Sequence, residues 1–433
     1  MKINLKKTLL YISMFLVLLY PFNSSISNII YRNNFNCILT VTIGTIGMIV
    51  FQDKISFKKK SILILAISTI FMLMTLINNY YVVDGYELKV ILYIIYLFLP
   101  LIISIGSNNV DALCKVIKIF FLEHIISTYI GLFFKEFYKS KILSLICSGR
   151  SLCVASGNYY HGYIPGLTSH FSTNAIYLSI SSLFLFSEYL TNKKKSTLLF
   201  FLISIVALFT AGKRAHLIFT IFCCIALYLY DRNTKNSSGK IFKLSLFIII
   251  GIIGLSILSK YIPEILNIIN RFELLIDSGD VLNGRQELYN LAISLWNKHM
   301  FFGNGWGAFS HNYQLYLYNY GDVAYVDAHN VFIQLLCEVG IVGLLFVLII
   351  MLTSFNKTLK LLKSKLNAND NTLTISRFCF VYQLFFLLYC FTGNPLYDSQ
   401  CYVIYFMTIG FILFISSRNR EVTNEKSRNN NIL

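Results

Sequence analysis

Charged residues are scarce in this chain. Only 13% of its 433 residues are Asp, Glu, Lys or Arg, whereas 56% are hydrophobic. A soluble globular domain carries about 25% charged residues. The chain also lacks the short alternating segments that a membrane β-barrel needs, and continuous apolar runs recur from end to end instead. The composition therefore excludes an ordinary soluble domain and predicts an all-α, polytopic integral membrane protein.

Three further absences narrow this prediction. The first apolar run follows three lysines but lacks a small-residue cleavage site, so we expect a retained first helix and not a signal peptide. The ten cysteines show no metal-ligand spacing. Cys147 and Cys153 share one loop, where they either pair or remain free thiols. No internal repeat or heptad stands out, and the polar, Asn-rich tail at 418–433 is expected to be disordered.

The apolar runs predict about twelve transmembrane helices, since each crossing needs about 20 residues. They centre on Thr8–Phe22, Cys37–Phe51, Ser61–Ile77, Leu88–Ile105, Val116–Phe134, Asn174–Leu190, Leu198–Ala211, Leu217–Tyr230, Phe242–Ser259, Val331–Phe355, Phe378–Phe391 and Cys401–Ser416. Nine helices thus fall within residues 1–259, with a loop at about 135–173. A large, partly helical loop at 260–330 follows, and three more helices occupy 331–417.

The distribution of basic residues predicts the orientation. With both termini in the cytoplasm, cytoplasmic segments hold about two thirds of the 37 Lys and Arg residues, as the positive-inside rule requires. The two long loops then lie outside the cell, and the protein is expected in a bacterial cytoplasmic membrane. The net charge of +17 is explained by topology, so nucleic acid is not an expected partner.

Some basic residues nevertheless fall on the outer face. They are Lys213 and Arg214 in a tight turn, and Arg150, Lys260, Arg271, Arg285 and Lys298 in the long loops. Two readings are open. Arg side chains bind phosphate oxygens bidentately, which would suit a phosphorylated ligand at headgroup level. Alternatively, these side chains extend to lipid headgroups as simple anchors.

The second long loop combines an amphipathic stretch with a polar end. Leu288, Leu291, Ala292, Leu295 and Trp296 recur at helical spacing, which predicts a helix lying on the membrane or on the bundle. Next comes G-N-G-W-G, whose glycines permit positive φ and a turn back onto the bundle, while Trp306 suits a sugar ring or the interfacial belt.

Ionisable residues near the apolar spans allow catalytic and structural readings. His329, with Asp327 two residues away, precedes the tenth span. A neutral His there could act as a general base or as a structural hydrogen-bonding group. Glu123 and His124 within the fifth span, and Glu338 just inside the tenth, are candidates either for a buried hydrogen-bonded role or for a transport path.

Over roughly residues 205–345 these motifs resemble the superfamily of O-antigen ligases and polymerases. The resemblance consists of T-A-G-K-R-A-H at the end of a span, N-G-R before an amphipathic helix, G-N-G-W-G, and A-H-N followed by a helix containing E-x-G-x-x-G. It implies about twelve helices, one large outer loop, and glycosyl transfer without a metal or cofactor. It also implies essential roles for Arg214, Arg285 and His329. Many members have S-R where this chain has Lys213-Arg214.

The resemblance implies a polyprenyl-diphosphate-linked glycan as donor. Arg214 and Arg285 would neutralise the diphosphate, and His329 would deprotonate the acceptor. Lys213, Arg150, Arg271, Lys298, Asp327 and Trp306 would contact the substrate. A polymerase for O-antigen or capsular polysaccharide is favoured over a ligase because the Lys-, Ile- and Asn-rich composition is typical of strain-specific polymerases. A flippase is a further alternative. Membrane lipids and a chain-length regulator are expected partners.

Overall fold

The computed structural model describes residues 5–23, 34–52, 86–106, 109–147, 149–230, 254, 257, 260, 284–318, 326–363 and 370–430. The elements in these ranges are helices: α1 (Leu5–Phe22), α3 (Asn34–Val50), α5 (Tyr86–Leu97), α6 (Leu99–Ile105), α7 (Asn109–Phe133), α8 (Lys135–Phe137), the π-helix η1 (Tyr138–Leu143), α9 (Ser144–Ile146), α10 (Gly149–Tyr160), α11 (Phe171–Asn192), α12 (Lys195–Thr210), α13 (Arg214–Tyr230), α16 (Gln286–Trp296), α17 (Ala308–Tyr318), α18 (Val331–Lys363), α19 (Asp370–Cys390) and α20 (Ser399–Asn430).

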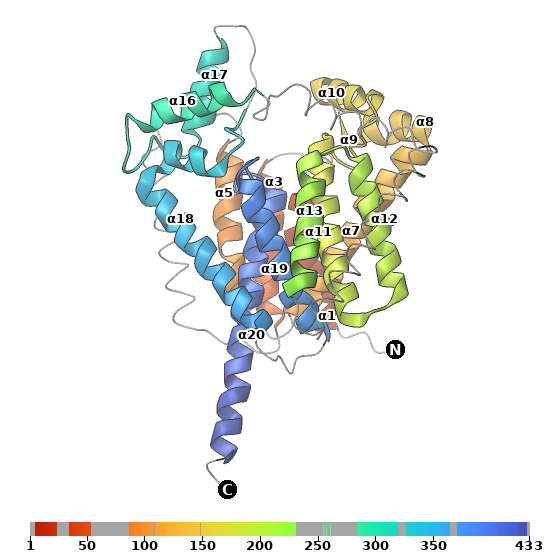
Figure 1. Ribbon diagram of the computed structural model, residues 1–433, viewed down its shortest axis with the longest axis vertical. Coiled ribbons are helices and arrows are strands. Elements are labelled where there is room, and N and C mark those ends of the chain that lie inside the picture. The colour runs from red at the N-terminus through yellow and green to blue at the C-terminus, as the bar shows by residue number, and fades with distance from the viewer. Residues whose placement is uncertain are drawn as a thin grey trace.

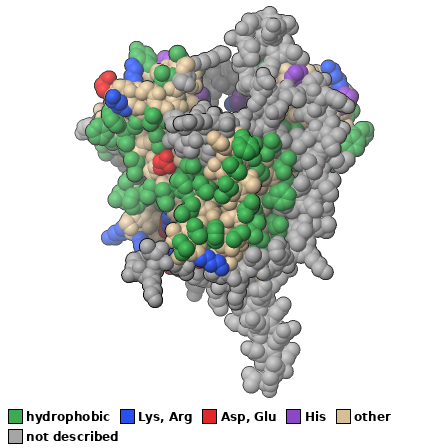
Figure 2. All heavy atoms as spheres, turned by 180° about the vertical axis from the view of Figure 1, so that it is seen from behind, with side chains coloured by type: hydrophobic (Ala, Val, Ile, Leu, Met, Phe, Trp, Pro, Cys, Tyr) green, Lys and Arg blue, Asp and Glu red, His purple; other side chains and the backbone are tan. Residues whose placement is uncertain are grey.

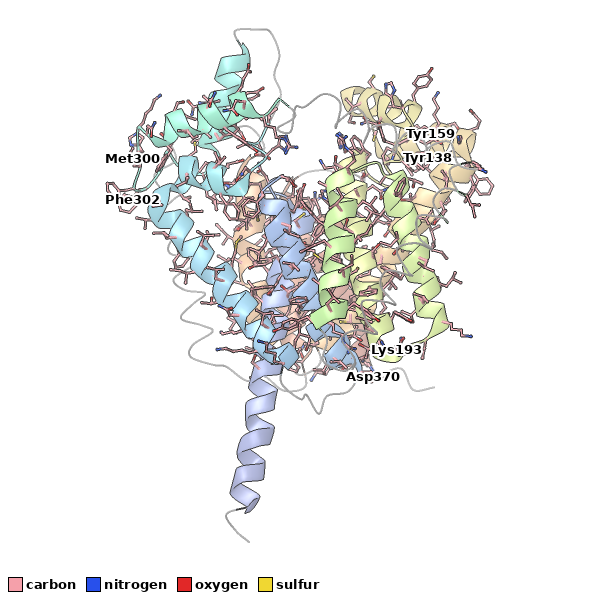
Figure 3. All side chains as sticks on the ribbon, in the orientation of Figure 1. Tyr138, Tyr159, Lys193, Met300, Phe302 and Asp370 are labelled. Carbon is pink, nitrogen blue, oxygen red and sulfur yellow. The ribbon has the colours of Figure 1, made fainter. Side chains whose placement is uncertain are left out.

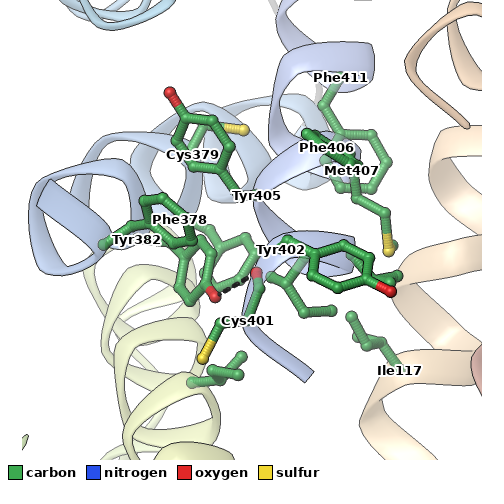
Figure 4. Close-up of a cluster of buried hydrophobic side chains, with 14 of the residues drawn as sticks. Ile117, Phe378, Cys379, Tyr382, Cys401, Tyr402, Tyr405, Phe406, Met407 and Phe411 are labelled. Carbon is green, nitrogen blue, oxygen red and sulfur yellow. Dashed lines mark hydrogen bonds between the residues drawn. The ribbon is translucent and has the colours of Figure 1, made fainter. Parts of the chain in front are cut away.

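The long helices stand side by side in one bundle (Figure 1). The short helices α10, α16 and α17 gather at one end, and the last turns of α20 extend from the opposite end. Helix α19 lies at the centre, against α11, α13, α18 and α20. Its packing against α20 is dominated by aromatic side chains, and the Tyr382 hydroxyl donates a 2.8 Å hydrogen bond to the Cys401 carbonyl (Figure 4). The bundle thus presents one end that carries extra helices.

Five helices of the described residues are long and apolar enough to cross a membrane. They are Leu5–Phe22, Val110–Phe133, Val331–Lys363, Asp370–Cys390 and Ser399–Ser417. Shorter apolar helices cover Phe35–Val50, Ile91–Ile105, Lys195–Thr210 and Arg214–Tyr230. Hydrophobic side chains fill the middle of the face seen in Figure 2, and Lys and Arg side chains lie toward its two ends. The protein is therefore an all-α membrane protein.

Ten of the predicted spans coincide with helices of the structure. The span at 61–77 lies outside the described residues, and the span at 242–259 does so except for residues 254 and 257. The total of about twelve stays a prediction. One difference concerns the tail: α20 continues as helix to Asn430, where the sequence predicted disorder from residue 418. An established span supplies the nucleus for this extension, and adding turns to an existing helix costs little.

Both long loops contain helices at the same end of the bundle. The first holds α8, η1, α9 and α10, and the described part of the second holds α16 and α17 (Figure 1). Helix α16 confirms the amphipathic prediction: it buries Leu288, Ala292 and Leu295 and packs against α18, so its apolar face lies on the bundle. Cys147 and Cys153 are free thiols, the first buried and the second exposed.

Candidate active site

Two cations and a carboxylate lie near enough to His329 to act on its charge. Lys213 belongs to the turn between α12 and α13, Arg285 is the residue before α16, and Asp327 and His329 precede α18. The pKa of His329 is lowered to about 4, most by burial and then by the charges of Arg285 and Lys213, while Asp327 acts in the opposite direction. The imidazole is therefore neutral at pH 7 and free to accept a proton.

The backbone of His329 is held in an unusual conformation. Its φ is +55°, in the left-handed region, which costs roughly 1–2 kcal/mol for a residue with a Cβ. Both neighbours fix it. The Asn330 side chain caps α18 by accepting hydrogen bonds from the N–H groups of Phe332 (3.0 Å) and Ile333 (3.2 Å), and the Ala328 N–H donates to Gln334 Oε1 at 3.0 Å. Such strain is typical of functional sites.

Gln334 is the centre of a buried hydrogen-bond network beneath His329. Its Oε1 also accepts from Asn394 Nδ2 at 2.6 Å, and its Nε2 donates to Asp327 Oδ1 (3.1 Å) and Glu338 Oε1 (3.2 Å). The hydroxyl of Tyr397 donates to Glu338 Oε2 at 2.8 Å. Asp327 therefore faces Gln334, and no hydrogen bond joins it to the His329 ring among the described residues. Its predicted role in orienting His329 stays a prediction.

Arg285 connects α16 to the end of α19. Its Nη1 donates a 3.1 Å hydrogen bond to the carbonyl of Thr392, just past Cys390 where α19 ends. The guanidinium is partly buried, and its charge acts on the neighbouring Tyr389 as well as on His329. Arg285 is thus anchored at one nitrogen and remains near enough to act on the charge of the imidazole.

Lys213 and Arg214 occupy a turn whose shape depends on Gly212. Gly212 has a φ of +75°, and a Cβ there would lie 2.2 Å from Cδ1 of Tyr163. Arg214 begins α13 and is partly exposed. The cation that acts on His329 from this turn is Lys213, which also lowers the pKa of His170 after burial. The sequence prediction emphasised Arg214, whereas the structure brings Lys213 into the group with Arg285 and His329.

The G-N-G-W-G turn docks into a break in α18. Helical geometry is interrupted at Gly340, which has a φ of +67°. There the N–H groups of Asn304 and Gly305 donate to the carbonyls of Cys337 (2.9 Å) and Glu338 (2.8 Å). Gly303, Gly305 and Gly307 all have positive φ, which confirms that these glycines turn the loop back onto the bundle.

The remaining predicted contacts lie in different places. Trp306 stacks on Tyr397 with ring centroids 4.6 Å apart, so it packs above the Glu338 network. Lys298 is exposed and lies past the far end of α16 from Arg285, a helix of about 16 Å. Arg150 belongs to α10, and Arg271 lies outside the described residues. In the ranges described, no group of three His, Cys, Asp or Glu could hold a metal ion.

Glu123 and His124 have structural roles at the end of α1. The Asn23 amide donates to the Glu123 carboxylate, and His124 Nε2 lies 2.9 Å from the carbonyl of Phe22. The His124 ring stacks on Tyr177 at 3.9 Å. These contacts match the hydrogen-bonded reading of the pair.

Sequence reasoning missed Gln334, Asn394 and Tyr397. The segment T-G-N-P-L-Y-D between α19 and α20 gave a signal, because polar residues gather there directly between two apolar helices. Gln334 was also detectable: it lies one helical turn before Glu338, on the same face of α18.

Comparison with known proteins agrees with this geometry. Residues 199–348 match the family model described as O-antigen ligase. The matched segment includes Lys213, Arg214, Arg285, His329 and the Gly340 break. The match over this segment supports the superfamily of O-antigen polymerases and ligases. No curated protein matches the chain.

Proposed function

We propose that this protein is a polymerase that joins polyprenyl-diphosphate-linked repeat units into O-antigen or capsular polysaccharide. The observation that carries the proposal is the neutral His329 beside Arg285 and Lys213, at the end of a membrane bundle that also bears α16 and α10. A lipid diphosphate lies at the membrane boundary, so its charge can reach these cations while its tail stays in the bilayer. The family match supports glycan transfer and gives no support to a flippase.

The chemistry follows from the arrangement of charges. The acceptor hydroxyl attacks the anomeric carbon of the donor, and the bond between that carbon and the diphosphate oxygen breaks. The electron pair leaves with the diphosphate, whose charge Arg285, Lys213 and Arg214 stabilise; fixed cations aimed at developing charge are efficient stabilisers. His329 takes the hydroxyl proton.

The low pKa of His329 is compatible with this role once the donor is bound. Arg285 and Lys213 destabilise the imidazolium in the free protein. A diphosphate placed beside them offsets their charge, so the pKa of His329 rises as the substrate binds. Binding of the donor therefore makes His329 a stronger base.

The active face is proposed to be the outer face of the cytoplasmic membrane, with both termini in the cytoplasm. A ligase that transfers the finished glycan to a lipid core is the second candidate, favoured by the description of the matching family. A deletion strain separates them. Loss of a polymerase leaves single repeat units on the anchor, whereas loss of a ligase leaves lipid-linked polymer unattached.

The direct test uses purified protein in proteoliposomes with lipid-linked repeat units and no nucleotide. The native chain should lengthen the glycan, and Arg285→Gln and His329→Ala should each lower the rate about 100-fold or more, the usual effect of removing such a group. Lys195→Met is the matched control, since Lys195 is exposed at the start of α12. Full activity of both site variants would refute the mechanism.

A further inference from the structure

The turn at residues 300–302 exposes three large apolar side chains, although it belongs to a loop that the sequence predicts to lie outside the membrane. Met300, Phe301 and Phe302 are 47%, 69% and 65% exposed. Figure 3 shows Met300 and Phe302 at the side of the molecule, directed away from the bundle. Apolar side chains that cluster on a surface mark a site of interaction.

Backbone hydrogen bonds fix this turn at one level of α18. The N–H groups of Ile341 and Val342 donate to the carbonyls of Met300 (2.9 Å) and Phe301 (3.2 Å), directly after the break at Gly340. From that break to Lys363, α18 is about 34 Å long, which suffices for a hydrocarbon core of about 30 Å. A crossing that begins at this break would therefore have the 300–302 turn at its edge.

The apolar surface is continuous from the turn into the span. The exposed side chains of α18 begin with Val342 (41%), directly beside the turn, and continue with Leu345, Ile349 and Leu352. This is the lipid-facing stripe of a membrane helix. A polar edge borders the turn on its other side, because Lys298 and His299 are exposed. The Trp296 indole N–H closes the turn with a 3.0 Å hydrogen bond to the Met300 carbonyl.

We propose that the 300–302 turn inserts into the bilayer leaflet on the α16 side, with its three side chains among the acyl chains. Lys298 and His299 then stand at the level of the lipid phosphates, where a cation on a long apolar stem is favoured. The occupant of this surface is membrane lipid. Insertion of the turn thus favours headgroup anchoring by Lys298 over the binding of a phosphorylated ligand.

Insertion also positions α16 relative to the membrane. The helix is about 16 Å long, and Arg285 stands at the end opposite the turn. With one end held at the lipid boundary and the other bonded to Thr392, the guanidinium is fixed near headgroup level. This consequence rests on the proposed function, whereas insertion itself does not.

Fluorescence quenching tests insertion independently of catalysis. Phe301→Trp and Tyr160→Trp are each made in the otherwise native chain, so that Trp296 and Trp306 contribute equally to both and the Trp296 hydrogen bond to Met300 is kept. Tyr160 is the matched control because it ends α10 and is 87% exposed. The full-length variants are reconstituted in phosphatidylcholine vesicles with or without acyl chains brominated near the headgroup, and iodide serves as the aqueous quencher.

Brominated lipid should remove more than half of the emission that the Phe301→Trp substitution adds, and iodide should remove little of it; Tyr160→Trp should show the reverse. Quenching of Phe301→Trp by iodide alone would overturn the proposal. So would protection from both quenchers, which would mean that protein covers the turn. Met300→Trp and Phe302→Trp repeat the measurement if Phe301→Trp fails to fold. Because emission is read and not turnover, an inactive protein can still support insertion.

Discussion

The protonation of His329 depends on neighbours that come from three separate segments of the chain. Burial and the charges of Arg285 and Lys213 disfavour the imidazolium, and Asp327 favours it. Burial has the largest effect, and both cations lower the pKa in the same direction. The pKa of His329 therefore falls to about 4, and the ring is neutral across the physiological range. Each cation can therefore be tested through the pH at which this ring protonates.

Removing the charge of Lys213 should shift the acidic limb of the pH–activity profile to higher pH. The cation holds the pKa of His329 down, so Lys213→Met should raise this pKa from about 4 toward the ordinary value of 6.5. Activity is lost once the ring is protonated, and the acidic limb of kcat/KM should shift to higher pH by a fraction of a unit to about one unit. The measurement is the pH profile of glycan lengthening in proteoliposomes.

The position of the limb is informative even if Lys213→Met also lowers the rate. Lys195→Met, exposed at the start of α12, should leave the limb unchanged. An unchanged limb in Lys213→Met would mean that the titrating group is not His329.

Gln334 should be more important for stability than its uncharged side chain suggests. Gln334→Leu removes the partner of the Ala328 N–H, the Asn394 amide and two carboxyl oxygens. Each buried group left unpaired costs about 1–3 kcal/mol. We expect a clear fall in the thermal unfolding midpoint in detergent, together with loss of activity because the backbone before His329 is released. Gln286→Leu, an exposed position on α16, should change the midpoint little.

At the scale of elements, the break in α18 is built for the docking of the glycine-rich turn. A Cβ on Gly340 would lie 2.3 Å from the Phe301 carbonyl oxygen, and one on Gly303 would lie 2.4 Å from the Glu338 carbonyl oxygen. Gly340→Ala should therefore destabilise the fold by at least about 2 kcal/mol, through left-handed strain and the clash. Thermal unfolding of the purified variant measures this.

Gly157→Ala is the matched control, because Gly157 lies in α10 and a Cβ there meets nothing within 4 Å. It should stabilise slightly, by about 0.5–1 kcal/mol, since Ala is the better helix former. Equal effects of the two substitutions would contradict the docking role of Gly340.

Some elements could be predicted from the sequence because their signals are local. The apolar runs predicted helices such as α7 and α19, and the spacing of Leu288, Ala292 and Leu295 predicted α16. Both signals depend only on residues that are close together in the sequence. The glycines of the turn likewise predicted its return to the bundle.

The candidate site was only partly predictable for the opposite reason. His329 and Arg285 were identified from their motifs, but the proximity of Lys213 to His329 depends on how α13 packs, more than 100 residues earlier in the chain. The bond between Gln334 and Asn394 joins residues 60 positions apart. Periodicity carries no information about such pairings, which arise from the tertiary packing of α18 on α19.

At the scale of the whole molecule, the two ends of the bundle differ. Helices α10 and α16 stand at one end, while Lys193 and Asp370 lie at the other, as Figure 3 shows. The last turns of α20 leave from that second end (Figure 1). Two of the segments that the positive-inside rule assigns to the cytoplasm, those at Lys193 and Asp370, thus share one end with the C-terminal helix, and the candidate site belongs to the other.

A native cysteine provides a test of this orientation. Cys153 is exposed on α10, whereas eight of the other nine cysteines are buried and Cys114 is partly buried. If the α10 end faces outward, a membrane-impermeant maleimide should label the native protein in intact spheroplasts, and Cys153→Ser should abolish the label. Lys193→Cys in that background, placed at the opposite end, should react only after the membrane is permeabilised. Labelling of Lys193→Cys in sealed spheroplasts would reverse the topology and move the site to the cytoplasm, where lipid-linked repeat units are not polymerised by the proposed route.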